Sequence, residues 1–224
     1  MIIIEYSKKN HKQIIRAVSM AILHEKTVAI PTDTSYALAA LAPRNEALDR
    51  LYAIKGRSFD KPIHIFHSSL YDLTDVVSVD AGTRRLLKEF WPGPLTLVLP
   101  FIKQKDSNVK TKSAWKALTR LSAHSGFLGF RKPNHAIPLD IVKTIKGSIT
   151  ATSANVSGMP DCYSGDEIIA QYKNRKLKPD ILIYVKSLPK KKPSTVLKIE
   201  GDRYTILRQG PITEKQIQKV LNKK

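Results

Sequence analysis

Four polar side chains fall into two pairs, each with one residue between its members. Lys55 and Arg57 form the first pair, and Ser153 and Asn155 form the second. On a helix, residues at i and i+2 point about 200° apart, whereas in an extended or looped segment they point to the same side. We therefore expect one cationic surface and one hydrogen-bonding surface. Two cations with two neutral donor–acceptor groups suit the polyphosphate and the nucleoside of a nucleotide.

Two further polar segments each follow a predicted strand, where side chains gather at the edge of a sheet. Residues 31–34 read Pro-Thr-Asp-Thr, and Arg131 opens the segment Arg-Lys-Pro-Asn-His. An arginine can bind a carboxylate through two parallel hydrogen bonds. Both segments also fit a structural role, because Asp33 and Thr34 can bond their own backbone in a turn and Arg131 can form a surface ion pair. We expect His135 to orient its loop rather than to act as a base.

The histidines and the single cysteine do not predict a metal site. His64 and His67 lack the spacing of metal ligands, and Cys162 alone permits neither an internal disulfide nor a multi-cysteine cluster. The sequence also lacks a Walker phosphate loop and a dinucleotide-binding glycine fingerprint. A lone cysteine indicates a reduced, cytoplasmic setting.

The composition is that of a globular protein with an unusual charge. A chain of 224 residues can bury one good core, so we expect a single domain over residues 1–224. Lys and Arg number 38 against 19 Asp and Glu, which gives a net charge of +19. That excess suggests a polyanionic partner such as RNA or a nucleotide, or else a solvated basic face. No stretch approaches the roughly 18 apolar residues that span a membrane, and the first residues are too short for a signal peptide.

Apolar periodicity predicts helices and strands in alternation along the chain, which favours an α/β domain with one main sheet. The predicted helices cover residues 10–25, 45–54 (with Asn45 as cap), 80–91, 137–145, 166–173 and 213–222. The predicted strands cover residues 27–30, 62–66, 95–99, 127–130, 149–152, 181–185, 194–199 and 203–208. Two basic segments, residues 102–118 and 186–193, are predicted to be loops.

The order of these segments resembles that of the YrdC-like threonylcarbamoyl-AMP synthases of the single-domain TsaC type. The matching pieces span roughly residues 10–212. They are Pro31-Thr-Asp-Thr34 with Tyr36, Lys55-Gly-Arg57, Lys61-Pro62, Phe90-Trp-Pro-Gly-Pro-Leu-Thr-Leu97, Arg131 with Pro133 and His135, Ser153-Ala-Asn-Val-Ser-Gly158, Ser194-Thr-Val196, and Arg208 with Gly210. The Lys-x-Arg and Ser-x-Asn pairs in this order, with the Trp-Pro-Gly-Pro block between them, make the resemblance specific.

The resemblance implies a twisted mixed sheet with flanking helices around a basic concave cavity. It implies an enzyme that condenses L-threonine, bicarbonate and ATP into threonylcarbamoyl-AMP and pyrophosphate, for threonylcarbamoyladenosine in tRNA. The implied catalytic residues are Lys55, Arg57, Ser153 and Asn155, and the implied ATP-binding residues are these four with Lys61, Ala151 and Arg208. Thr34, Arg131 and Ser194 would bind threonine, and Mg²⁺ would accompany ATP without a marked site of its own. Implied partners are the downstream threonylcarbamoyl transferase machinery and tRNA or double-stranded RNA.

The chain departs from the family pattern mostly near the implied threonine pocket. Residues 35–39 read Ser-Tyr-Ala-Leu-Ala where the family has Val-Tyr-Gly-Leu-Gly, a spelling similar to that of YciO-type paralogues. Phe66 stands where many members have a histidine that contacts threonine. The alternative interpretation is therefore an RNA-binding or ribosome-maturation paralogue that lacks synthase activity. A third is a domain that handles a carbamoyl-adenylate for another acceptor amine.

Overall fold

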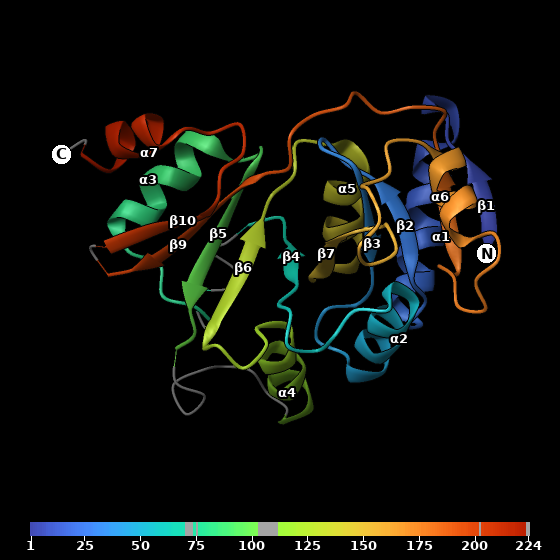
Figure 1. Cartoon of the computed structure of the whole chain (residues 1–224), viewed down its shortest axis with the longest axis horizontal. Helices are drawn as coiled ribbons and strands as arrows, with labels where there is room; N and C mark the ends of the chain where they lie inside the picture. Colours follow the sequence, from blue (N-terminus) through green and yellow to red (C-terminus); the bar gives the residue numbers. More distant parts are fainter. Residues whose placement is uncertain (70–73, 75, 103–111, 202, 223–224) are drawn as a thin grey trace.

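One mixed sheet runs through the molecule (Figure 1). The computed structural model describes residues 1–69, 74, 76–102, 112–201 and 203–222. Within these residues the sheet has ten strands in the order β1-β8-β2-β3-β7-β4-β6-β5-β9-β10. The strands are β1 (Ile2–Glu5), β2 (Val28–Pro31), β3 (Tyr36–Ala39), β4 (His64–Phe66), β5 (Leu95–Pro100), β6 (Phe127–Arg131), β7 (Ile149–Ser153), β8 (Ile181–Tyr184), β9 (Thr195–Glu200) and β10 (Arg203–Arg208). The predicted α/β fold with a twisted mixed sheet is confirmed.

The sheet mixes parallel and antiparallel neighbours. The parallel pairs are β1–β8, β8–β2, β4–β6 and β5–β9. The antiparallel pairs are β2–β3, β3–β7, β7–β4, β6–β5 and β9–β10. The short strand β4 lies between β7 and β6 and so joins the two halves of the sheet. Residues far apart in sequence therefore meet beside β4.

Helices cover the sheet in groups. They are α1 (His11–Leu23, preceded by the 3₁₀ turn Lys8–Asn10), α2 (Asn45–Lys55), α3 (Ala81–Phe90), α4 (Lys112–Leu121), α5 (Ala136–Ile145), α6 (Gly165–Tyr172) and α7 (Glu214–Leu221). Helices α1 and α5 pack together, and α5 contacts β2 and β4. Helices α3 and α7 pack together beside the β9–β10 end, and α2 packs on α4 (Figure 1). Every residue of β2 and β3 is buried, as expected for strands in the interior of a covered sheet.

Most predicted elements are present within one or two residues of their predicted bounds. Two predictions need correction, and two strands were missed. Residues 112–118 are helical rather than a loop, because Ala114, Ala117, Leu118 and Leu121 form an apolar stripe within a lysine-rich segment; residues 103–111 lie outside the described part. Arg44 rather than Asn45 is the N-cap of α2, since the Asn45 side chain donates to Ser113 instead. Strands β1 and β3 were not among the predicted elements. In the described part of the chain, no helix is both long and apolar enough to cross a membrane.

Candidate functional site

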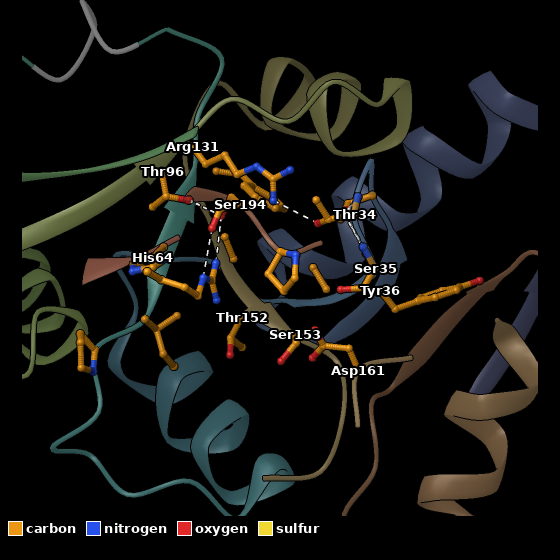
Figure 2. A pocket seen from close by; sticks show the side chains of 18 of the residues that line it. Thr34, Ser35, Tyr36, His64, Thr96, Arg131, Thr152, Ser153, Asp161 and Ser194 are labelled. Atoms are coloured by element: carbon orange, nitrogen blue, oxygen red, sulfur yellow. Dashed lines mark hydrogen bonds between the residues drawn. The ribbon is translucent and has the colours of Figure 1, made fainter. Parts of the chain in front are cut away.

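A cavity of about 180 Å³ lies where the two halves of the sheet meet beside β4 (Figure 2). Strands β3, β4, β5, β6 and β7 and the turns around β9 and β10 supply its walls. Its lining residues are Thr32, Thr34, Ser35, Tyr36, Ala37, Arg57, Pro62, Ile63, His64, Phe66, Thr96, Arg131, Ala151, Thr152, Ser153, Asp161, Pro193, Ser194 and Arg208. Three arginines against one carboxylate make this a concave site for an anion.

Arg131, the last residue of β6, is held in place on three sides. Its Nε donates to the Gly93 carbonyl at 3.1 Å, Nη1 donates to Thr34 Oγ1 at 3.2 Å, and Nη2 donates to Asp33 Oδ1 at 2.8 Å. The Arg131–Asp33 ion pair is almost fully buried, with side chains 7% and 9% exposed. Burial lowers the pKa of Arg131, and the nearby Asp33 charge opposes that shift. The remaining N–H groups of the fork leave Arg131 able to bind a second carboxylate.

Ser194 is the centre of a second hydrogen-bonded group. Its hydroxyl lies 2.8 Å from Thr96 Oγ1 and accepts from Arg208 Nη2 at 3.0 Å (Figure 2). Arg208 Nε also donates to the Ser194 carbonyl at 3.0 Å. Close backbone packing supports this corner, because a Cβ at Gly210 would lie 2.3 Å from the Thr195 nitrogen. Arg208, at the end of β10, thus lines the cavity while two hydrogen bonds to Ser194 hold its guanidinium.

Arg57 is the third cation of the cavity. One Nη2 hydrogen bond, of 3.1 Å, ties it to the Pro62 carbonyl. Its Nε is buried without a hydrogen-bond partner among the described residues. A buried donor with no partner costs free energy.

Lys55 lies beneath the cavity rather than beside Arg57 on one surface. It ends α2, and Gly56 then turns into the left-handed region at φ 59°, so the expected common cationic surface is not formed. The Lys55 side chain is buried, and its ammonium donates to the carbonyls of Ser153 and Asn155 and to Asn155 Oδ1. Burial, and then the charge of Arg57, lower the pKa of Lys55 to about 8. Lys55 therefore holds the segment that follows β7.

That segment brings the Ser153 and Asn155 side chains into contact, but they do not form the expected common hydrogen-bonding surface, since only Ser153 lines the cavity. Ser153 Oγ donates to Asn155 Oδ1, and Asn155 Nδ2 donates to the Met159 carbonyl. Ser153 and Ala151 line the cavity, whereas Asn155 is buried behind it. Asn155 is thus placed to fix the loop and to orient Ser153.

The cavity also contains groups that sequence reasoning did not assign to a site. Thr96 and His64 lie on one side of it, and Asp161 lies on the other beside Ser153 (Figure 2). Thr96 sits inside the Trp-Pro-Gly-Pro-Leu-Thr block, so its motif was a usable signal, whereas no spacing marks Asp161. The predicted residue Lys61 is exposed and is not among the residues that line the cavity.

The described residues contain no group of three or more His, Cys, Asp or Glu side chains that could hold a metal ion. Asp161 is the one carboxylate among the residues that line the cavity. Mg²⁺ is commonly held by one or two carboxylates together with substrate phosphates.

The chain is similar to a known family and to named proteins. A family model described as Sua5_yciO_yrdC, telomere recombination, matches residues 20–210. The chain is 33% identical over 217 residues to the threonylcarbamoyl-AMP synthase of Bacillus subtilis, covering 95% of this chain and 57% of that protein. It is 30% identical over 218 residues to a Methanocaldococcus jannaschii protein provisionally given the same name, covering 94% of this chain and 92% of that protein.

The chain is also similar to a solved structure. The crystal structure of P. abyssi Sua5 complexed with L-threonine has a TM-score of 0.85 and 30% identity, and the match covers 99% of this chain and 61% of that chain. The chain therefore spans less than two thirds of the B. subtilis and P. abyssi proteins. The two named relatives carry the name of the synthase and neither that of an RNA-binding protein.

Proposed function

This chain belongs to the Sua5/YciO/YrdC family, and from that premise we propose that it is a threonylcarbamoyl-AMP synthase. The reaction condenses L-threonine, bicarbonate and ATP into threonylcarbamoyl-AMP with release of pyrophosphate and water; the water leaves when the threonine amine and bicarbonate form the carbamate. One observation carries the proposal: a single cavity joins two cations suited to phosphates, Arg57 and Arg208, to a third, Arg131, suited to a carboxylate. An amino acid and a nucleotide can therefore bind in contact.

The chemical step is an adenylyl transfer. An oxygen of the threonine carbamate attacks the α-phosphorus of ATP, and the bond from that phosphorus to the pyrophosphate oxygen breaks. Negative charge builds on the phosphate oxygens during the step, so fixed cations in a partly enclosed site stabilise the transition state. Placement of the two reactants supplies the rest of the rate acceleration, and no covalent nucleophile is needed.

We assign the nucleotide to the wall formed by Arg57, Arg208, Ala151 and Ser153. Arg57, which lines the cavity, would donate to a phosphate oxygen. Lys55 and Asn155 would act through the Ser153 segment, which they hold from below. Lys61, exposed beyond the cavity, would approach the phosphates only from the solvent side.

We assign threonine to the wall that contains Arg131, Thr34 and Ser194. Arg131 would bind the threonine carboxylate, since Thr34 and Asp33 already fix its plane. The hydroxyls of Thr34 and Ser194 would bond the polar groups of the amino acid. Phe66 lines the same wall and supplies an apolar surface for the threonine methyl group.

Asp161 fits a role toward the Mg²⁺ that accompanies ATP. Its carboxylate lines the cavity near Ser153, and no hydrogen bond or ion pair within the described residues engages it. Bound Mg²⁺ would neutralise part of the phosphate charge. The product would pass to a threonylcarbamoyl transferase acting on tRNA.

Pyrophosphate release from ATP tests the proposal directly. Threonine and bicarbonate are added singly and then together, and we expect release only with both. A matched arm uses Arg131→Ala, which should raise the threonine KM by tenfold or more, since a buried charge-assisted bond is lost. ATP turnover that is absent, or that ignores threonine at saturating bicarbonate, would exclude the synthase and favour the RNA-binding paralogue.

A further inference from the structure

His64 faces the cavity but plays no part in the roles assigned above. It begins β4, and residues 64 and 66 of this strand both line the cavity. Because side chains alternate along a strand, Ile65 and His67 face the other side. There His67 Nδ1 lies 2.8 Å from Ser148 Oγ. No hydrogen bond of the His64 ring is found among the described residues, so its nitrogens are available to a ligand.

The neighbouring strand is built to accommodate this ring. Gly129 of β6 lies against it, and a Cβ at Gly129 would come within 2.2 Å of His64 Cδ2. The imidazole thus occupies the space that a side chain of β6 would fill. His64 is therefore a packed and oriented residue, not a freely moving one.

Three arginines line the same cavity as the ring. Arg208 comes from β10, Arg57 follows α2, and Arg131 comes from β6, while β7 places the uncharged Ala151 opposite His64. Burial is the largest cause, followed by the charges of these arginines, and together they lower the pKa of His64 to about 4. In the empty cavity the ring is accordingly neutral at physiological pH.

We infer that His64 is a phosphate contact that takes up a proton when the triphosphate of the nucleotide enters the cavity. The inference rests on the proposed function. A polyanion bound between Arg57 and Arg208 offsets the positive charge that disfavours the imidazolium. Once protonated, the ring is a donor at both nitrogens and adds a charge-assisted hydrogen bond to a phosphate oxygen.

This coupling has a defined sign. The pKa of His64 is low in the empty cavity and higher in the complex, so the complex binds more protons than the free protein. Nucleotide affinity must then rise as pH falls from the pKa of the complex toward about 4. For one group the rise is at most about tenfold per pH unit.

Calorimetry of MgATP binding, without threonine or bicarbonate, tests the inference. Titrations at about pH 6 in two buffers of different ionisation enthalpy give the number of protons taken up on binding. We compare wild type with His64→Gln, which keeps a hydrogen-bonding side chain that cannot titrate. The matched control is His24→Gln, an exposed residue at the end of α1. His24→Gln shows what the loss of a remote histidine does to the uptake, so a lower uptake by His64→Gln alone reports on His64 and the phosphate it contacts.

We expect wild type and His24→Gln to take up more protons than His64→Gln, by up to about one per nucleotide bound. Equal uptake by a His64→Gln protein that still binds ATP would overturn the inference and leave the synthase proposal intact. Failure of the wild type to bind ATP would instead contradict the proposed function. If His64→Gln does not fold, NMR titration of the wild-type histidine rings decides: a midpoint near 4 that saturating ATP leaves unmoved would overturn the inference.

Discussion

At the scale of single residues, two neighbouring cations have different roles. Lys55 is buried and donates to main-chain carbonyls of the Ser153 segment, whereas Arg57 lines the cavity and keeps an unpartnered Nε. Removing one partner of a buried contact between an ammonium and carbonyl groups costs far more free energy than removing an exposed charge. Lys55 should therefore act on stability, and Arg57 on the reaction.

Replacing each residue separately tests this division. Lys55→Met should lower the free energy of unfolding by about 2–4 kcal/mol, because the carbonyls it satisfies stay buried. Arg57→Ala should change it by less than about 1 kcal/mol but reduce kcat by roughly 10²–10³, as for loss of a transition-state donor. Urea unfolding and pyrophosphate release measure the two effects. A Lys55→Met protein of normal stability but low turnover would instead place its ammonium on the phosphates.

The i, i+2 argument from sequence places Ser153 and Asn155 side by side, but neither pair forms the expected common surface, because Asn155 and Lys55 are buried behind the cavity. Ser153 ends a strand, and its hydroxyl bonds the Asn155 side chain, as extended geometry predicts. Lys55 still belongs to α2, and the left-handed Gly56 reverses the chain before Arg57. The spacing of residues does not reveal where a helix ends, because tertiary packing decides its last turn. Which predicted residues contact substrate therefore stays a prediction.

At the scale of elements, β4 and β6 determine the shape of the cavity. Strand β4 presents His64 and Phe66 to it, β6 presents Arg131, and the lack of a side chain at Gly129 leaves room for the His64 ring. A glycine within a strand weakens the strand, so its presence reflects a close approach. Packing across two strands thus fixes the imidazole.

A double-mutant cycle on Gly129 and His64 tests this packing. Gly129→Ala should destabilise the wild type by about 1–3 kcal/mol, because the new methyl group overlaps the ring. In a His64→Ala background the same change should cost much less, since the ring is gone. The expected coupling is at least about 1 kcal/mol, obtained from urea unfolding of the four proteins. Additive effects would show that the two residues do not compete for this space.

Sequence patterns predicted most elements but not β1, β3 or α4. Strand β3 is short and reads Tyr-Ala-Leu-Ala, which is weak in β-branched residues; burial on both faces stabilises it. In α4 the lysines concealed an apolar stripe that packs on α2. Only β3 is a case of tertiary packing overriding local preference, whereas the helical pattern of α4 was present in the sequence and was missed. The strand order that gathers Arg57, Arg131 and Arg208 is likewise set by long-range pairing, which one sequence does not encode locally.

At the scale of the whole molecule, part of the net charge of +19 lies in a basic segment next to the cavity. Residues 186–193 connect β8 to β9 across the gap between the two halves of the sheet (Figure 1). Lys190, Lys191 and Lys192 of this segment are exposed. Lys191 and Lys192 line a hollow that also contains Thr34 of the cavity wall. A basic rim of this kind raises the local concentration of anions, both nucleotides and RNA.

The single domain expected over residues 1–224 stays a prediction.

Direct tRNA binding by this rim would be electrostatic. Each neutralised phosphate releases counterions, so affinity should fall steeply between about 50 and 200 mM salt and show little sequence preference. Changing Lys190, Lys191 and Lys192 together to Ser should weaken tRNA binding and reduce the salt slope by roughly 2–3. Exchanging Lys8, Lys9 and Lys12 for Ser, near the start of α1, removes the same charge away from the cavity and serves as the control. Filter binding of tRNA at several salt concentrations measures both variants. If the two variants bind tRNA equally well, the net charge rather than this segment attracts RNA. If neither variant nor the wild type binds tRNA at low salt, tRNA is not a direct partner. The lysines would then serve only the nucleotide.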